Sequence, residues 1–308
     1  MTQPLVLPSG ITLLERGWLS SNNILITGPN HSALIDSGYA THAGQTLALV
    51  AAALNGRTLD VLINTHLHSD HCGGNAALQA RYPALQILIP PGQAAHVANW
   101  NPTALSYTPT GQICDPFGFN ATLQPNTEIE LGHQIWQIHA APGHDPSSVI
   151  LFEPKSRLLL SADALWENGF GVVFPELDGD DAFAEVERTL ELIESLHAKT
   201  VIPGHGPAFA DVPAALVRAR KRLDSFVNDP AKHLRYAAKV LIKFKLLEVQ
   251  TIEFAALLAW AQATELVAHV HQSDAPDTRF DAWVNQLVTD LVRSGAAHRD
   301  QLMVRNAA

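Results

Sequence analysis

The sequence is most distinctive at Thr65-His66-Leu67-His68-Ser69-Asp70-His71-Cys72-Gly73-Gly74. This stretch places three imidazoles and a carboxylate directly after a short apolar strand that we predict at residues 61–64. Imidazole nitrogen and carboxylate oxygen are ligands that Zn²⁺ and similar ions prefer. The two glycines allow a tight turn into the helix that we predict next. A metal-binding turn is therefore favoured over an ordinary polar loop.

Three further segments place His144, Asp163 and His205 beside predicted apolar strands. Each segment alone is a weak signal. A histidine in a Gly/Pro turn is usually a surface residue, and Asp163 alone would be an ordinary helix N-cap. Together with the first stretch they supply five histidines and two aspartates.

In this order, the motifs resemble the metallo-β-lactamase superfamily of metal-dependent hydrolases over about residues 10–209. The resemblance implies an αββα sandwich with two metal ions at one sheet edge. It implies that one ion is held by His66, His68 and His144, that the other is held by Asp70, His71 and His205, and that Asp163 bridges them. It also suggests that Asp36, after a predicted strand at residues 32–35, supports the metal loop; a plain turn aspartate is the alternative. Cys72 lies outside the ligand positions and is read as a packed small residue.

We expect two divalent cations, zinc first and iron or manganese as alternatives. Metal coordination lowers the pKa of water toward ~7, so a metal-bridging hydroxide would be the nucleophile. Asp70 is the candidate catalytic residue, because its carboxylate could orient the water proton and return it to the leaving group.

The ligand motif does not separate the activities of the superfamily. Residues 65–74 resemble glyoxalase II. The resemblance implies hydrolysis of a thioester, ester or lactone carbonyl, with an anionic or acyl small molecule as the substrate. A metal-dependent nuclease acting on RNA or single-stranded DNA is the alternative. A non-catalytic regulatory protein is the third hypothesis, and the complete ligand set disfavours it.

The hydrophobic pattern predicts an α+β fold in which strands come in runs with a few helices between them. Helices are expected at 40–54, 76–81 and 181–196. Strands are expected at 11–18, 24–27, 32–35, 61–64, 86–89, 129–131, 135–139, 149–152, 158–160 and 200–202.

The charge distribution suggests two domains. Residues 1–209 hold seven Lys and Arg against nineteen Asp and Glu, whereas residues 210–308 hold thirteen against eleven. We therefore expect a catalytic domain at 1–209 and a C-terminal domain at 210–308. Helix-forming residues there predict an all-helical domain, and the resemblance to superfamily members that append a winged-helix-like domain at this point implies that form as the alternative. A stripe of Lys232, Arg235, Lys239 and Lys243 on one predicted helix face is either a solvated surface or a surface for an anionic substrate or RNA.

Two segments are expected to line the pocket, the loop-rich stretch Pro90–Asn120 and Trp166–Gly171. The two cysteines, Cys72 and Cys114, suggest reduced thiols in a cytoplasmic protein. Apolar runs are too short for a membrane span, and no positively charged segment precedes Arg16 as in a signal peptide.

Overall fold

The computed structural model describes residues 5–307 and contains two compact units. The first unit extends to residue 105 and continues with residues 113–223, and the second contains residues 106–112 and the chain from residue 224. The observed division after residue 223 lies within helix α8 (Val212–Val227). The assignment of residues 1–209 and 210–308 as separate domains stays a prediction.

The first unit contains two sheets. In the first sheet, strands β1 to β3 are antiparallel, and β3 to β6 are parallel. Its strands are β1 (Ile11–Leu14), β2 (Asn23–Thr27), β3 (Ser32–Ile35), β4 (Val61–Ile63), β5 (Gln86–Ile89) and β6 (Ala121–Thr122).

The second sheet has the order β11-β10-β9-β8-β7. Its strands β7 to β10 are antiparallel, and β11 joins β10 in parallel. The strands are β7 (Thr127–Leu131), β8 (Gln134–Ala140), β9 (Val149–Glu153), β10 (Leu158–Ala162) and β11 (Thr200–Pro203).

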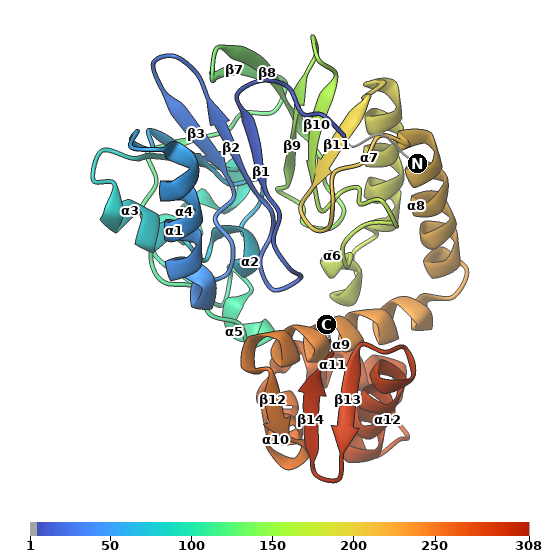
Figure 1. The fold of residues 1–308 in the computed structure, drawn as a ribbon. Helices are drawn as coiled ribbons and strands as arrows, with labels where there is room; N and C mark the ends of the chain where they lie inside the picture. Colours follow the sequence, from blue (N-terminus) through green and yellow to red (C-terminus); the bar gives the residue numbers. More distant parts are fainter. Residues whose placement is uncertain (1–4, 308) are drawn as a thin grey trace. The chain divides into compact units, whose positions relative to one another are not determined.

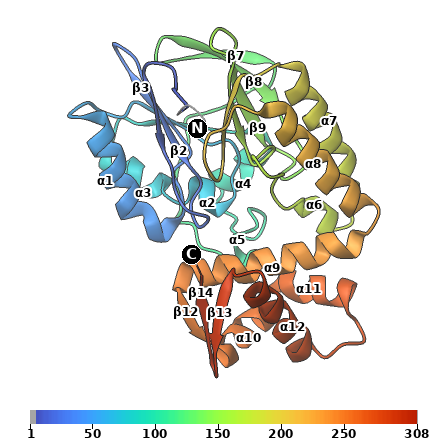
Figure 2. The ribbon, with the colours of Figure 1, turned by 45° about the vertical axis from the view of Figure 1, so that its right-hand side comes forward.

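The two sheets pack on each other through apolar side chains that both contribute. Ile35 from the first sheet and Trp136 and Leu151 from the second belong to one core cluster and are fully buried. Helices α1 (Ala43–Leu54) and α3 (Asn75–Arg81) cover the outer face of the first sheet, and α7 (Phe183–Ser195) and α8 cover that of the second (Figure 1, Figure 2). This arrangement confirms the predicted αββα sandwich.

Several short elements lie between the strands and helices up to residue 177, and most lie where the sequence predicted loops. The predicted helix at 40–54 begins with a 3₁₀ turn, η1 (Ala40–His42). The stretch Pro90–Asn120 contains short helices, and its residues 106–112 group with the second unit. These elements are α2 (Ser69–Cys72), η2 (Pro91–Gln93), α4 (Ala94–Ala98), α5 (Tyr107–Thr110) and α6 (Phe174–Leu177).

The second unit combines helices with a three-stranded sheet of order β12-β14-β13. Because this sheet is present, the prediction of an all-helical C-terminal domain is wrong. The order of elements is a helix, a strand, three helices and a β-hairpin, which agrees with the winged-helix-like alternative. Its elements from residue 230 onward are α9 (Pro230–Val249), β12 (Thr251–Glu253), α10 (Phe254–Ala263), α11 (Glu265–Asp274), α12 (Phe280–Arg293), β13 (Ala297–Asp300) and β14 (Met303–Asn306).

The basic stripe on α9 is partly engaged within the second unit. Lys243 Nζ donates hydrogen bonds to the carbonyl oxygens of Ala296 and Ala307 and to Asn306 Oδ1. Arg235 pairs with Asp274, with Nε 3.1 Å from Oδ1. Lys243 therefore binds the end of the C-terminal strand. Because Lys243 and Arg235 have partners, the stripe of Lys232, Arg235, Lys239 and Lys243 is not one unpaired basic face.

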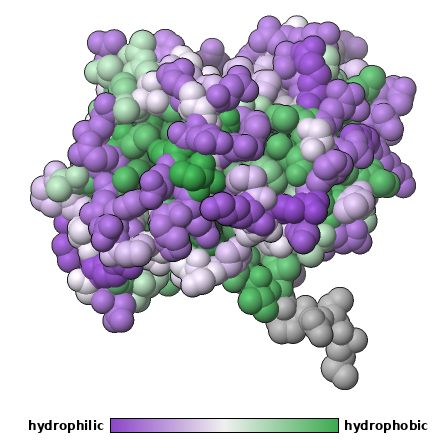
Figure 3. All heavy atoms as spheres, turned by 90° about the horizontal axis from the view of Figure 1, so that it is seen from above, coloured by the Kyte–Doolittle hydropathy of each residue, from purple (hydrophilic) through white to green (hydrophobic). Residues whose placement is uncertain are grey.

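Hydrophilic residues cover most of the face in Figure 3, and hydrophobic ones show between them in several small areas. Within residues 5–307, none of the helices combines the length and apolar character that crossing a bilayer demands.

Candidate metal centre

The seven residues singled out in the sequence lie at the ends of strands from both sheets. The segment with His66, His68, Asp70 and His71 follows β4, and His144 follows β8. Asp163 follows β10 and His205 follows β11, two strands that are parallel and so end at the same sheet edge. The sandwich therefore brings together residues that are up to 139 positions apart, as the separation of His66 and His205 shows.

His66, His68 and His144 form the first group. Each offers a ring nitrogen, and these atoms lie within 4.8 Å of one another. His68 Nδ1 is 2.8 Å from His144 Nε2. Three imidazole nitrogens that face a common point are a ligand set suited to zinc.

Asp70, His71 and His205 form the second group, with ligand atoms again within 4.8 Å of one another. Asp70 Oδ2 lies 3.1 Å from His205 Nε2 and 4.0 Å from His71 Nε2. His71 and His205 are buried, whereas Asp70 is partly accessible. This group combines a carboxylate that solvent can reach with two fixed imidazoles.

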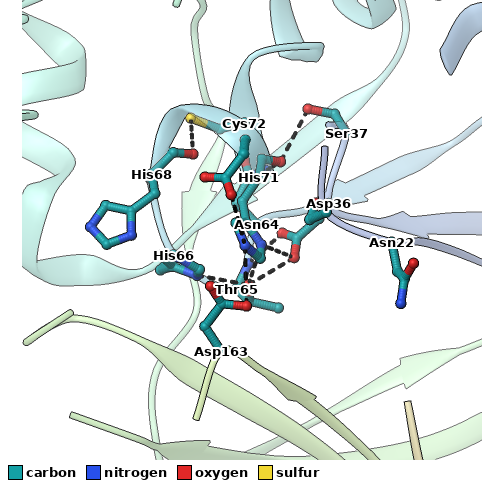
Figure 4. A network of polar contacts seen from close by, with 12 residues as sticks. Asn22, Asp36, Ser37, Asn64, Thr65, His66, His68, His71, Cys72 and Asp163 are labelled. Atoms are coloured by element: carbon teal, nitrogen blue, oxygen red, sulfur yellow. Dashed lines mark hydrogen bonds and ion pairs between the residues drawn. The ribbon is translucent and has the colours of Figure 1, made fainter. Parts of the chain in front are cut away.

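Asp163 lies between the two groups. Its Oδ1 is 3.5 Å from His71 Nε2, and its Oδ2 is 3.4 Å from His144 Nε2 and 3.9 Å from His205 Nε2. Figure 4 shows Asp163, from the second sheet, opposite His66 and His71 from the loop after β4. The carboxylate therefore contacts members of both groups, which is the position expected of a bridging ligand.

Hydrogen bonds to the far ring nitrogens orient three of the imidazoles. His71 Nδ1 donates to Asp36 Oδ2 at 2.8 Å, and His144 Nδ1 donates to the carbonyl oxygen of Val172 at 2.5 Å. His66 Nδ1 lies 3.2 Å from Thr65 Oγ1. Such contacts from the outer ring nitrogen are the usual way in which proteins orient metal-ligating histidines.

The inner nitrogens of two rings have no hydrogen-bond partner within the described chain. His66 Nε2 and His71 Nε2 are buried and make no hydrogen bond to any residue of 5–307. A buried polar atom without a partner is costly. These unpartnered nitrogens, together with the imidazole and carboxylate donors around them, fit divalent metal ions.

Asp36 lies beneath this cluster, where the sequence suggested a supporting residue. Its carboxylate accepts hydrogen bonds from the backbone N–H of Thr65 at 2.9 Å and from Thr65 Oγ1 at 2.8 Å, besides the one from His71. Asp36 has a φ of 57°, an uncommon value outside glycine. The carboxylate thus joins the end of β3 to the first residue of the metal loop.

Burial and neighbouring charges shift the pKa values of these groups. Burial lowers the pKa of His66 well below its usual value, and burial with the nearby His144 lowers that of His68 to about 3. Burial raises the pKa of Asp163, but the charges of His205 and His71 outweigh it, so the pKa lies well below the usual range. Neutral imidazoles and an ionised carboxylate are the forms that bind a cation.

Aromatic rings surround the cluster, and sequence reasoning identified only some of them. Trp166, in a segment predicted to line the pocket, packs 5.7 Å from the ring of His205. Trp18 stacks on His205 at 5.5 Å, and Phe174 packs edge-on against His68 at 4.9 Å. Trp18 and Phe174 were missed because they lie outside the ligand motifs, and only folding brings them to the histidines.

Cys72 is buried behind the loop, as predicted for a packed small residue. Its Sγ donates to the carbonyl oxygen of His68 at 3.3 Å and lies 3.9 Å from Cys114 Sγ. Neither cysteine forms a disulfide in the described structure.

In the segment Pro90–Asn120, which was expected to line the pocket, Trp100 packs edge-on against Phe117 at 5.6 Å.

Residues 16–205 match the family model described as the metallo-beta-lactamase superfamily. A hydroxyacylglutathione hydrolase of Anaeromyxobacter dehalogenans is 32% identical over 142 residues, which cover 46% of this chain and 45% of that enzyme. An acyl-coenzyme A thioesterase of Gallus gallus is 23% identical over 217 residues, which cover 65% of this chain and 78% of that enzyme. The match thus spans less than half the length of the hydroxyacylglutathione hydrolase.

Among solved structures, a metallo-beta-lactamase family protein from Thermus thermophilus has the same fold. Its TM-score is 0.60 at 16% sequence identity, and the match covers 98% of this chain and 100% of that one.

Proposed function

The chain belongs to the metallo-beta-lactamase superfamily, and from this premise we propose that it hydrolyses thioesters at a centre of two divalent metal ions. The observation that carries the proposal is that five imidazoles and two carboxylates form adjoining groups of three, within each of which the ligand atoms lie within 4.8 Å of one another. The Nε2 atoms of His66 and His71 also have no hydrogen-bond partner in residues 5–307.

We assign His66, His68 and His144 to one ion and Asp70, His71 and His205 to the other, with Asp163 shared. Zinc is the first candidate, because neutral imidazole and carboxylate suit it, and iron or manganese are alternatives. Such ions supply Lewis acidity and make hydroxide available at neutral pH.

Asp70 is the proposed proton carrier. Burial raises its pKa, but the charge of His71 and the hydrogen bond from His205 outweigh burial, so the pKa lies below its usual value. The carboxylate is therefore ionised at neutral pH and can hold a water proton at an oxygen and pass it to the leaving thiolate. No serine or cysteine nucleophile is required.

The thioester class rests on the relatives and on the rings beside the cluster. Two of the relatives are named for thioester-type substrates, a hydroxyacylglutathione and an acyl-coenzyme A. Trp18 and Phe174 flank the histidines and offer apolar surface that would hold an acyl group and exclude water. An ester or lactone would present the same carbonyl.

Nuclease activity has less support. From residue 224 onward, nine Lys and Arg stand against ten Asp and Glu. Proteins that bind nucleic acid usually carry a clear basic excess. We therefore treat RNA cleavage as an outcome of the test.

A substrate panel tests the proposal: a hydroxyacylglutathione thioester, an acyl-coenzyme A, a lactone, a phosphodiester and a short RNA, each with and without chelator. We expect thioester hydrolysis that chelator abolishes and added Zn²⁺, Mn²⁺ or Fe²⁺ restores. His144→Ala and Asp163→Ala should lose this activity, whereas His96→Ala, at an exposed histidine of α4, should retain it. Cleavage of RNA without thioester hydrolysis would refute the proposal, as would thioester turnover that chelator leaves unchanged.

We also propose a cytoplasmic location. Two cysteines in a chain of 308 residues are typical of reduced thiols in a reducing compartment. Cell fractionation with an antibody to the protein tests this, and recovery in an extracellular or periplasmic fraction would contradict it.

A further inference from the structure

The segment between β10 and α6, residues 163–173, contacts the candidate metal centre from one side. Trp166 Nε1 donates a hydrogen bond to Asp163 Oδ1 at 3.1 Å. The carbonyl oxygen of Val172 accepts the hydrogen bond from His144 Nδ1. At Gly171 an added Cβ would lie 2.4 Å from His144 Nδ1, so the backbone approaches this ring more closely than a side chain would permit. This segment thus contacts two of the seven proposed metal ligands, Asp163 and His144.

The hydrogen bond from Trp166 distinguishes the two oxygens of Asp163. Oδ1 is taken by the indole N–H and faces His71, whereas Oδ2 faces the Nε2 atoms of both His144 and His205. The carboxylate of an aspartate can rotate about its Cβ–Cγ bond, and this rotation swaps the positions of Oδ1 and Oδ2. A donor on one oxygen opposes that rotation, and hydrogen bonds to ionised groups are about twice as strong as neutral ones.

Trp166 is itself held in place from several directions. Its ring packs edge-on against Trp18 at 5.2 Å, and its backbone N–H donates to the carbonyl oxygen of Gly169 at 2.6 Å. Two arginines of α8 fix the rest of the segment. Arg218 Nε donates to the carbonyl oxygen of Glu167 at 2.7 Å, and Arg222 Nη1 donates to that of Phe170 at 2.9 Å. The indole is therefore a fixed donor.

We propose that Trp166 is a positioning residue of the metal centre, whose indole N–H holds Asp163 Oδ1 and so keeps Oδ2 turned toward His144 and His205. The inference rests on the proposed function, because it takes Asp163 to be the ligand shared by two ions. If the inference holds, metal affinity depends on Trp166 as well as on the seven proposed ligands.

Trp166→Phe tests the proposal, because phenylalanine keeps an aromatic ring and removes the N–H. The matched control is Trp283→Phe in α12 of the second unit, because the Trp283 indole N–H also donates to a carboxylate, Asp274 Oδ2 at 2.9 Å, and neither residue belongs to the metal centre. Metal-free wild type and both variants are titrated with Co²⁺, followed by visible absorption, and bound metal is counted by elemental analysis. Loss of an outer-shell contact typically weakens metal binding 10–100-fold.

We expect Trp166→Phe to bind at least one Co²⁺ ion about 10-fold more weakly, with an altered absorption band, and Trp283→Phe to bind as wild type. Equal affinities and spectra for Trp166→Phe and wild type would overturn the inference and leave the proposed function standing. Failure of the wild type to bind Co²⁺, Zn²⁺, Mn²⁺ or Fe²⁺ would instead overturn the proposed function.

A second replacement separates the hydrogen bond from packing. 3-Benzothienylalanine at position 166 has the two-ring shape of tryptophan but carries sulfur in place of the N–H. We expect this protein to unfold at the wild-type temperature when metal-free and to bind Co²⁺ as weakly as Trp166→Phe. Wild-type affinity in this protein would show that packing alone explains the effect and would refute the positioning role.

Discussion

At the scale of single residues, Asp36 shows how a side chain that touches no substrate can shape the site. It accepts hydrogen bonds from Thr65 and His71 while lying 2% exposed. Burial lowers the pKa of His71, but the charges of Asp36, Asp163 and Asp70 outweigh burial, so the pKa lies well above its usual value. A more basic imidazole is a stronger metal ligand once its proton has left.

Asp36→Asn should weaken metal binding about 10- to 100-fold, because asparagine carries no charge and offers one acceptor oxygen for three donors. Competition with a zinc-binding dye measures the affinity. Asp60→Asn is the control, since Asp60 Oδ2 accepts hydrogen bonds from the N–H and hydroxyl of Ser32 but no imidazole contacts it in the described structure. Equal losses in both variants would contradict a specific role for Asp36.

His233 makes stability depend on pH. Burial lowers the pKa of this α9 histidine to about 4, against about 6.5 in an unfolded chain. Between these values the unfolded state binds the extra proton, so stability rises with pH from about 4 to 6.5 and is lost as pH falls through that range. The expected loss from this residue at pH 5 relative to pH 7 is roughly 2 kcal/mol.

Urea unfolding of the wild type and His233→Gln at pH 7 and pH 5 checks this expectation. The variant should lose less free energy of unfolding on acidification than the wild type does. His298→Gln, at an exposed histidine of β13, should behave as wild type. The same pH dependence in all three proteins would rule out His233 as the source.

At the scale of elements, the turns at strand ends carry the site, and their backbone must approach side chains closely. At Gly204 an added Cβ would lie 2.2 Å from Asp163 Oδ1, and at Gly171 it would lie 2.4 Å from His144 Nδ1. Real side chains do not tolerate such distances, so both positions require glycine. The glycines in these turns are thus required for the ligand side chains to lie where they do.

Gly171→Ala should displace His144 and lower metal affinity and thioester turnover at least 10-fold, while the protein remains folded. Gly44→Ala in α1, where an added Cβ would meet nothing within 4 Å, should leave both unchanged. Metal counting and circular dichroism distinguish a displaced ligand from an unfolded chain. Full activity in Gly171→Ala would show that His144 tolerates movement.

The sequence predicted several strands better than the shortest helices. Strands β3 and β5 have the predicted bounds, because alternating or continuous apolar runs between turn residues specify them locally. The four-residue helices α2 and α5 were not predicted. Helices this short are stabilised by tertiary contacts, so the local pattern contains little signal for them.

At the scale of the whole molecule, metal binding should contribute to stability, because the ligands come from both sheets. A ligand bound to the folded state at 100 times its dissociation constant stabilises it by about 2.7 kcal/mol. We expect chelator to lower the unfolding temperature of the wild type by roughly 5–10 °C. Differential scanning calorimetry measures the shift, and Asp163→Ala should show a much smaller one. A chelator effect of equal size in both proteins would argue against this centre as its cause.

The sequence by itself determined which residues could bind metal and the order of the strands that carry them. It did so because ligand chemistry belongs to residue type, and because the apolar pattern of a strand and the turn residues at its end are local. Tertiary structure decided the rest. Only the packing of the two sheets placed Asp163 between His144 and His205. The same packing left Nε2 of His66 and His71 without hydrogen-bond partners in the described chain. It also brought Trp18, Trp166 and Phe174 beside the cluster. Distances between residues far apart in a chain depend on how its layers pack, and no local pattern encodes them.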